Sequence, residues 1–169
     1  DWTPISSLNP TAPTVKLLSS TEQETTVDFS VAGYFLETVT TPRGPQQIIN
    51  APKMASMVEE GAPDLPLFAI PIAIGDCAEM DVKVQKAEFQ EFDNIEIAPA
   101  KGNFSREIDP ENVPYRYGEA YFSNAFYPAS QAQLSDPYIL RDLRGQNIMV
   151  YPFAYNPVTK TLRVYTHIS

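Results

Sequence analysis

The sequence predicts an all-β fold, a single-domain antiparallel β-sandwich of jelly-roll-like type, on three observations. The chain has 169 residues, which suits one domain with one hydrophobic core. Its sixteen prolines outnumber its seven glycines, and nine tyrosines and nine phenylalanines add side chains that favour strands. Apolar and polar residues alternate along the clearest segments, as in half-buried strands. Together these features predict short extended segments joined by stiff turns.

The expected strands follow from this alternation along the chain. The first covers residues 27–31 and runs on toward 34–36, and the others are expected at 70–74, 82–89 and 95–97. Pro66 and Pro71 lack the backbone N–H that a sheet requires, so the strand at 70–74 is placed at a sheet edge or a bulge. The apolar positions of 82–89 change parity after Val84, and a β-bulge would absorb that change.

The last third of the chain predicts a β-hairpin within NIMVYPFAYNPVTKTLRVYTHI. Asn156 and Pro157 are expected to open the turn between its two strands. One face of the first strand is predicted to carry Met149, Tyr151, Phe153 and Tyr155, and one face of the second Leu162, Val164, Thr166 and Ile168. Residues 1–14 are expected to form an N-terminal extended segment that precedes the sandwich of residues 15–169.

Charge and composition exclude several classes of function. The formal net charge of −9 and the isoelectric point near 4.5 argue against nucleic-acid binding, because the twelve Lys and Arg residues are scattered. No apolar run reaches the length of a membrane span, so no membrane insertion is expected. One cysteine and one histidine cannot supply a structural zinc site, and no calcium loop or phosphate-binding glycine loop is present. No metal and no cofactor are therefore predicted.

The residue types that carry catalysis are almost absent. Cys77 and His167 are the only members of their kinds, and neither lies in a glycine-rich elbow or at a helix start. The simplest interpretation makes Cys77 an incidental thiol at a strand end and His167 a surface residue of the last strand. Taken alone, the residues predict a binding module that is not an enzyme.

Several long words of the sequence resemble a known family. VKLLSSTEQ, GAPDLPLFAIPIAI, IAPAKG, DPENVPYRYG, LSDPYILRDLRGQ and YNPVTKTLRVYTHI occur in the same order in the N-terminal prodomain (propeptide) of the gingipains. The match runs from about Val15 to Ile168. Gingipains are secreted bacterial cysteine endopeptidases that cleave after arginine or lysine. The words LSDPYILRDLRG and YNPVTKTLRVYT are long enough to make chance similarity a poor explanation.

The resemblance implies a function. The family's prodomain is a β-sandwich that assists folding of the peptidase, covers its active-site cleft and keeps the zymogen latent. The catalytic residues belong to the downstream domain, so no peptidase activity is expected here. The implied partner is the cognate catalytic domain, and the implied location is the exterior or cell surface of a Gram-negative bacterium, reached through the periplasm. The chain stops at Ser169, so residues 15–169 are expected to be a prodomain truncated at its C-terminus.

The resemblance also implies an inhibitory residue in KGNFSREIDPENVPYRYG. Family members that cleave after arginine carry an arginine just before a D-P turn, at the position of Arg106, and the lysine-specific relative carries lysine there. Arg106 is therefore expected to occupy the S1 pocket, where a guanidinium pairs with a carboxylate. The rest of the inhibitory loop is predicted to be Ser105, Glu107, Ile108, Asp109 and Pro110.

Other interpretations stay open at this point. Arg43 also lies in a proline-flanked loop and is the weaker alternative to Arg106, and it is also possible that no single arginine dominates. Arg141 and Arg144 bracket Asp142 and are expected to form a structural charge network.

The alternative function is a secreted carbohydrate- or protein-binding module, with Tyr115, Tyr117, Tyr121 and Tyr127 as an exposed platform. A third possibility is assistance to folding with weak inhibition.

Overall fold

The computed structural model describes all residues from Asp1 to Ser169 as thirteen strands and two short 3-10 helices, without an α-helix. The strands are β1 Trp2–Pro4, β2 Thr14–Ser20, β3 Thr25–Ser30, β4 Gly33–Thr41, β5 Gly44–Asn50, β6 Ala55–Ser56, β7 Pro66–Ala73, β8 Ala87–Phe92, β9 Ala132–Leu134, β10 Tyr138–Leu140, β11 Leu143–Val150, β12 Phe153–Asn156 and β13 Thr161–Ile168. The 3-10 helices are η1 Pro110–Asn112 and η2 Glu119–Phe122. The predicted all-β class is confirmed.

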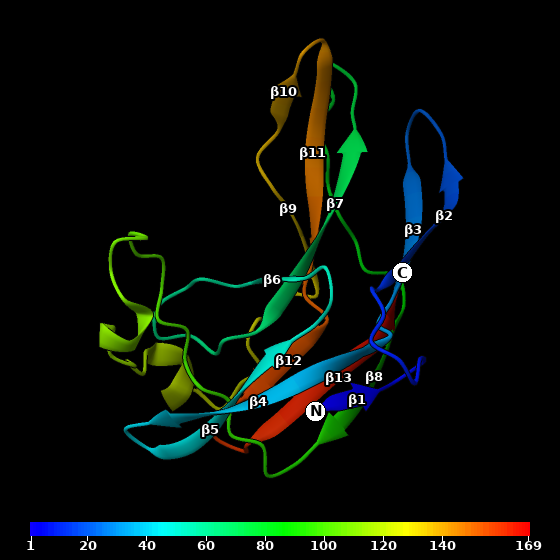
Figure 1. Ribbon diagram of the computed structural model, residues 1–169. Helices are drawn as coiled ribbons and strands as arrows, with labels where there is room; N and C mark the ends of the chain where they lie inside the picture. The colour runs from blue at the N-terminus through cyan, green and yellow to red at the C-terminus, as the bar shows by residue number, and fades with distance from the viewer.

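The strands form three sheets in which every strand pairs antiparallel to its neighbours. One sheet has the order β1-β4-β5, a second has the order β10-β11-β7-β6 with β9 beside β11, and a third has the order β12-β13-β3-β2 with β8 beside β13. Figure 1 shows β10, β11 and β7 rising as one arm, with the β2–β3 hairpin beside it. Because β1 pairs with β4, part of residues 1–14 joins a sheet, and the boundary at residue 15 stays a prediction.

One hydrophobic core of seventeen buried residues joins the sheets. Phe153 of β12 is fully buried, and Tyr34 of β4 meets its ring edge-on with the ring centroids 5.4 Å apart. Leu162 and Val164 of β13 are fully buried against the same cluster. Residues from β3, β4, β12 and β13 therefore meet at the centre of the molecule, and the loops that leave this core start from a rigid base.

The predicted strands at 27–31 and 70–74 are present with small changes in their bounds. β3 ends at Ser30 and β4 begins at Gly33, so the chain breaks once where continuity toward 34–36 was expected. β7 pairs with β11 over residues 68–73, and β6 covers only its first two residues. The other side of β7 is therefore open near Pro71, which agrees with the predicted edge position.

The predictions for 82–89 and 95–97 are partly wrong. Residues 82–86 form no strand, and β8 begins at Ala87. The register shift lies in the partner strand, between Tyr165 and His167 of β13, because the extra residue belongs to β13. Residues 95–97 form no strand either, and Ile97 makes a single parallel bridge to Gln47.

The hairpin at 153–168 is confirmed, but its first strand was assigned too long. Asn156 Oδ1 accepts the N–H groups of Val158 at 3.1 Å and of Thr159 at 3.3 Å, which stabilises the predicted turn. The expected common face of Met149, Tyr151, Phe153 and Tyr155 is wrong, since Ile148 and Val150, and not Met149, are the buried hydrophobic residues of β11. The parity changes because β11 and β12 belong to different sheets, with Pro152 between them.

Candidate functional site

The candidate site is a long loop, residues 101–117, that projects from the sheets and is drawn in yellow-green in Figure 1. Its two ends meet at Gly61. The N–H of Gly61 donates to the carbonyl oxygen of Ala100 at 3.1 Å. The N–H of Gly118 donates to the carbonyl oxygen of Gly61 at 2.8 Å. Gly61 has a φ of +82°, and a Cβ there would lie 2.9 Å from the nitrogen of Gly118. This close approach requires glycine, so Gly61 closes the loop at its base.

The tip of the loop is a β-turn from Ser105 to Ile108. The N–H of Ile108 donates to the carbonyl oxygen of Ser105 at 3.0 Å, which closes the turn. The hydroxyl of Ser105 accepts the N–H of Glu107 at 3.3 Å, as serine commonly does at the first position of a turn. Arg106 and Glu107 are the two central residues, so the peptide bond between them is the central peptide of the turn.

The segment after the tip is braced by local hydrogen bonds. Asp109 caps η1, because its Oδ1 accepts the N–H of Glu111 at 3.0 Å while Pro110 occupies the first helical position. The Nζ of Lys101 donates to the carbonyl oxygen of Pro110 at 2.8 Å and lies 4.4 Å from the ring centroid of Tyr115. We call this pair of contacts the Lys101 tether. It joins the start of the loop to the segment just beyond its tip.

Arg106 is exposed and makes no side-chain contact of its own. Its guanidinium has no hydrogen bond, no ion pair and no aromatic face within the chain. Glu107, Ile108 and Asp109 beside it are also exposed. The structure therefore exposes the unpaired guanidinium of Arg106 on a turn that is stabilised by hydrogen bonds.

Arg43, the alternative residue, has contacts within the chain. It lies in the turn between β4 and β5, and its guanidinium carbon is 3.8 Å from the ring centroid of Tyr117. The hydroxyl of Tyr117 in turn donates to Gln46 Oε1 at 2.6 Å. A guanidinium stacked on an aromatic ring is stabilised by the cation–π interaction. Arg43 therefore joins the β4–β5 hairpin to the base of the loop.

Three of the remaining arginines, Arg116, Arg144 and Arg163, have ion-pair or hydrogen-bond partners within the chain. Arg116 lies 3.7 Å from Glu60, and Arg163 forms an ion pair with Glu91 at 2.7 Å. The expected charge network around Asp142 is wrong, since Arg144 donates instead to the carbonyl oxygens of Gly75 and Ala78, both at 2.8 Å.

Arg141 is the second arginine without a side-chain partner. It occupies the two-residue turn between β10 and β11 with a φ of +57°. That turn is closed on both sides by paired strands, so Arg141 lies at a hairpin tip that cannot extend without unpairing the ladder. Of these two free arginines, only Arg106 lies in a long loop, whereas Arg141 lies in a tight turn between paired strands.

The four tyrosines considered for an exposed platform each contact other residues of the same chain. Tyr121 is buried, and its hydroxyl donates to the carbonyl oxygen of Ile97 at 2.7 Å, while burial raises its pKa. Tyr127 bonds through its hydroxyl to the carboxylate of Glu59, and its pKa is raised by burial and by that carboxylate. The ring of Tyr115 makes a cation–π contact with Lys101, and the ring of Tyr117 makes one with Arg43. The alternative of an exposed platform of all four tyrosines is therefore not supported, because Tyr121 is buried and the other three are half-buried.

Asp64 is the one carboxylic acid with a strongly shifted pKa near the loop. Burial raises its pKa from 3.8 to about 6. Its backbone N–H donates to the carbonyl oxygen of Ala98, which lies in the segment that leads into the loop. The pKa of Tyr115 is raised by its own burial and, to a smaller extent, by the charge of Asp64. Burial thus makes the ionised form of Asp64 less favourable than it is in water, although a pKa of about 6 leaves the acid mostly ionised at neutral pH.

Cys77 and His167 take no part in this site. Cys77 is exposed in the segment after β7. His167 is half-buried in β13, with Nε2 3.4 Å from Asp28 Oδ1, so the expected solvent-facing position is only partly right. No group of three His, Cys, Asp or Glu side chains is placed to hold a metal ion. No helix of the structure is long and apolar enough to cross a membrane.

Sequence reasoning missed Lys101 and Gly61. Lys101 precedes the predicted loop by four residues, and its acceptor is a backbone oxygen that carries no sequence signal. The GAPDLP segment that contains Gly61 is far from the loop in sequence, so its role depends on the tertiary fold.

Comparisons with known proteins give consistent relatives. The Propeptide_C25 family matches residues 7–169. Gingipain R1 of Porphyromonas gingivalis is 44% identical over 158 residues, which cover 93% of this chain and 16% of the relative. Gingipain R2 of Porphyromonas gingivalis is 40% identical over 156 residues, which cover 92% of this chain and 21% of the relative. The chain thus spans about a sixth to a fifth of the length of these relatives.

Two solved structures share the fold. A complex of the pro- and mature domains of RgpB from Porphyromonas gingivalis matches with a TM-score of 0.86 and 40% identity, over 91% of this chain and 80% of the other. A structure concerned with the zymogenic latency of gingipain K from Porphyromonas gingivalis matches with a TM-score of 0.79 over 100% of this chain and 98% of the other. The latter is 22% identical, so that likeness concerns the fold alone.

Proposed function

The chain belongs to the Propeptide_C25 family, the propeptides of gingipain-type cysteine endopeptidases, and from this premise we propose that it keeps such an endopeptidase latent by placing Arg106 in the S1 pocket. Membership makes the chain a propeptide and not the peptidase domain. The observation that carries the proposal is the free guanidinium of Arg106 at the tip of a braced loop. The proposed partner is the catalytic domain of the same precursor.

The chemistry of the S1 pocket suits this side chain. An endopeptidase that cleaves after arginine needs a carboxylate in its S1 pocket, and a guanidinium makes two parallel charge-assisted hydrogen bonds to it. The guanidinium of Arg106 has no partner to give up before it enters the pocket. Arg43 would first have to leave the ring of Tyr117 at 3.8 Å. The difference in prior contacts supports Arg106 over Arg43.

The turn also supplies a reason for slow cleavage. The Arg106–Glu107 peptide is the central peptide of a hydrogen-bonded turn, and the Lys101 tether holds the segment beyond it. Attack by the catalytic cysteine requires the scissile carbonyl in a near-attack geometry. We propose that Ser105, Glu107, Ile108, Asp109 and Pro110 hold the carbonyl of Arg106 away from that geometry. The loop then behaves as an inhibitor and is cleaved slowly.

Two further roles rest on the family relationship. We propose that the chain assists folding of the catalytic domain, since its own core is continuous and does not depend on a partner. We also propose that residues 15–169 carry the latency function and that the precursor is secreted through the periplasm to the exterior or cell surface. The alternative of a carbohydrate-binding module has lost its main support, because the four tyrosines contact residues of the same chain.

The test is inhibition of an arginine-specific gingipain catalytic domain by the purified chain. Arg106→Ala should weaken inhibition by about 2–5 kcal/mol, roughly 30-fold or more, because it leaves the S1 carboxylate buried without a partner. Arg106→Lys should weaken it less, since a point charge replaces the bidentate fork. Arg141→Ala is the matched control, because Arg141 is the other arginine without a side-chain partner. If Arg106→Ala and Arg141→Ala both inhibit like the parent chain, Arg106 has no part in inhibition.

A further inference from the structure

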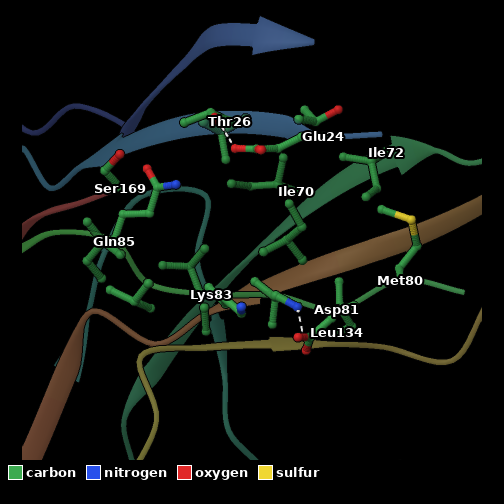
Figure 2. A pocket seen from close by; sticks show the side chains of 18 of the residues that line it. Glu24, Thr26, Ile70, Ile72, Met80, Asp81, Lys83, Gln85, Leu134 and Ser169 are labelled. Atoms are coloured by element: carbon green, nitrogen blue, oxygen red, sulfur yellow. Dashed lines mark hydrogen bonds between the residues drawn. The ribbon is translucent and has the colours of Figure 1, made fainter. Parts of the chain in front are cut away.

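A cavity of about 610 Å³ lies between the sheets, on a part of the molecule that the inhibitory loop does not use. Its apolar lining comes from separate strands, namely Val27 of β3, Ile70 and Ile72 of β7, Leu134 of β9, and Ile148 and Val150 of β11. In Figure 2 Thr26 of β3 and Glu24, which precedes β3, lie on one side of this space, Leu134 lies on the opposite side, and Ile70 and Ile72 lie between them. The volume falls within the range of about 300–1,000 Å³ that is typical of small-molecule sites.

One wall of the cavity is a segment that we call the lid, residues 79–84. The lid makes no backbone–backbone hydrogen bond, although the chain is fixed on both sides of it. On one side Arg144 Nη1 donates to the carbonyl oxygens of Gly75 and Ala78, both at 2.8 Å. On the other side the N–H of Gln85 donates to the carbonyl oxygen of Ser169 at 2.7 Å. A segment without ladder bonds between two fixed ends can open at low cost.

The sequence of the lid gives its two sides different characters. Val82 and Val84 are half-buried and line the cavity, while Asp81 and Lys83 are exposed beside them. Opening would expose two valines, whereas a bound apolar ligand would keep them covered. An alkyl chain bound between the lid and the strands would be covered on both sides. Each of its methylene groups removed from water would stabilise the closed, ligand-bound state by about 0.8 kcal/mol.

The charges at the edge of the cavity restrict the ligand. Glu24, Glu79 and Asp81 are exposed residues that line the cavity, and Lys83 is the only Lys or Arg among the lining residues. An anionic head group such as a carboxylate would meet an excess of negative charge there, in a chain whose formal net charge is −9. An uncharged head group meets no such penalty, and a cationic head group is attracted. Electrostatic complementarity of this kind determines specificity more than it determines affinity.

We propose that the cavity is a binding site for a single-chain amphiphile with an uncharged or cationic head group, and that residues 79–84 open to admit it. The alkyl chain would lie between β3 and the β7–β11 pair, and the head group would remain at the acidic opening beside Glu79 and Asp81. The proposal is independent of Arg106, so it can fail while inhibition through the loop stands.

The probe is N-phenyl-1-naphthylamine, an uncharged fluorophore whose emission rises in apolar sites. We expect saturable binding at one site per chain, with dodecylamine displacing the probe at lower concentration than dodecanoate, which has a chain of equal length and opposite charge. Ile72→Trp should lower probe affinity about tenfold or more, because the loss of apolar contact equivalent to about two methylene groups already accounts for that factor. Ile139→Trp is the matched control, since Ile139 is 77% exposed and lies outside the cavity.

Two more variants keep the test decisive. Val82→Trp fills the cavity from the lid, which carries no ladder hydrogen bond, so it preserves the sheets if Ile72→Trp does not fold. Glu79→Lys with Asp81→Lys should reverse the order of the two displacing ligands. Probe binding that does not saturate, or equal binding by a folded filled variant and by Ile139→Trp, would overturn the site. An unchanged order of displacement after charge reversal would overturn the head-group assignment.

Discussion

Replacing Lys101 with methionine removes the Lys101 tether while keeping an unbranched side chain that is only one atom shorter. The parent contacts are a hydrogen bond to the carbonyl oxygen of Pro110 at 2.8 Å and the approach to the Tyr115 ring at 4.4 Å. A hydrogen bond from a charged donor contributes about 1.5–3 kcal/mol when protected from water, and an exposed cation–π contact about 0.5–1 kcal/mol. Because Lys101 is only half-buried, we take about 1.5 kcal/mol for the two together.

That energy sets the expected change in cleavage. If the enzyme cuts the Arg106–Glu107 bond only when the turn opens, weakening the closed loop by about 1.5 kcal/mol raises the open population about tenfold. Lys101→Met should therefore be cut there about ten times faster than the parent chain by an arginine-specific gingipain. The assay is a time course of intact mass. Lys86→Met is the control, because Lys86 pairs with Glu88 outside the loop. Equal rates for Lys101→Met and Lys86→Met would refute the tether as the cause of slow cleavage.

Three further changes test the loop base and its surroundings. Gly61→Ala should lower the free energy of unfolding by about 1–3 kcal/mol in urea titrations, because its φ of +82° is strained for alanine. Asp64→Asn should raise the free energy of unfolding at pH 8 by up to about 3 kcal/mol and change it little at pH 4, the limit set by a pKa raised from 3.8 to about 6. Arg43→Ala should cost about 0.5–2 kcal/mol of folding stability through the lost stack on Tyr117, while the inhibition constant should change far less than for Arg106→Ala.

The sign of the Asp64 effect follows from its direction. A raised pKa means that the folded protein favours the protonated acid, so this stabilisation is complete below about pH 4 and is lost as the pH rises through about 6. Equal effects of Asp64→Asn at pH 4 and pH 8 would contradict it. An unchanged urea midpoint for Gly61→Ala would show that the loop base relaxes. A large loss of inhibition with Arg43→Ala would return Arg43 to the list of S1 residues.

Local patterns predicted the strands well where the two faces of a strand differ in burial. β3 and the β12–β13 hairpin follow from alternation and from the Asn156-Pro157 turn. The division into three sheets could not be predicted, because Pro152 interrupts an alternation that otherwise reads as one strand. The bulge was assigned to the wrong strand, since a register shift changes the pairing of both partners and the sequence of one strand does not tell which carries the extra residue.

The site could be predicted only in part. Arg106 was identified through the family resemblance and stays a prediction, and the signals for a turn around it were visible in S-R-E and D-P. Its lack of a partner could not be predicted, because it depends on what every distant residue of the fold does. Arg43 shows the same difficulty in reverse, as its partner Tyr117 is remote in sequence. The tyrosines were misjudged because exposure and burial of an aromatic residue give the same local pattern.

The closure at Gly61 separates the fate of the loop tip from that of the sheets. Since the two ends of the loop are fixed to one residue of another segment and Arg106 is exposed, we expect the side chain at position 106 to have little effect on how the core assembles. One substitution at the tip could then adapt the propeptide to an enzyme with a different preference, with no compensating change elsewhere. The specificity of the loop tip could therefore change during evolution while the core and the loop base stay the same.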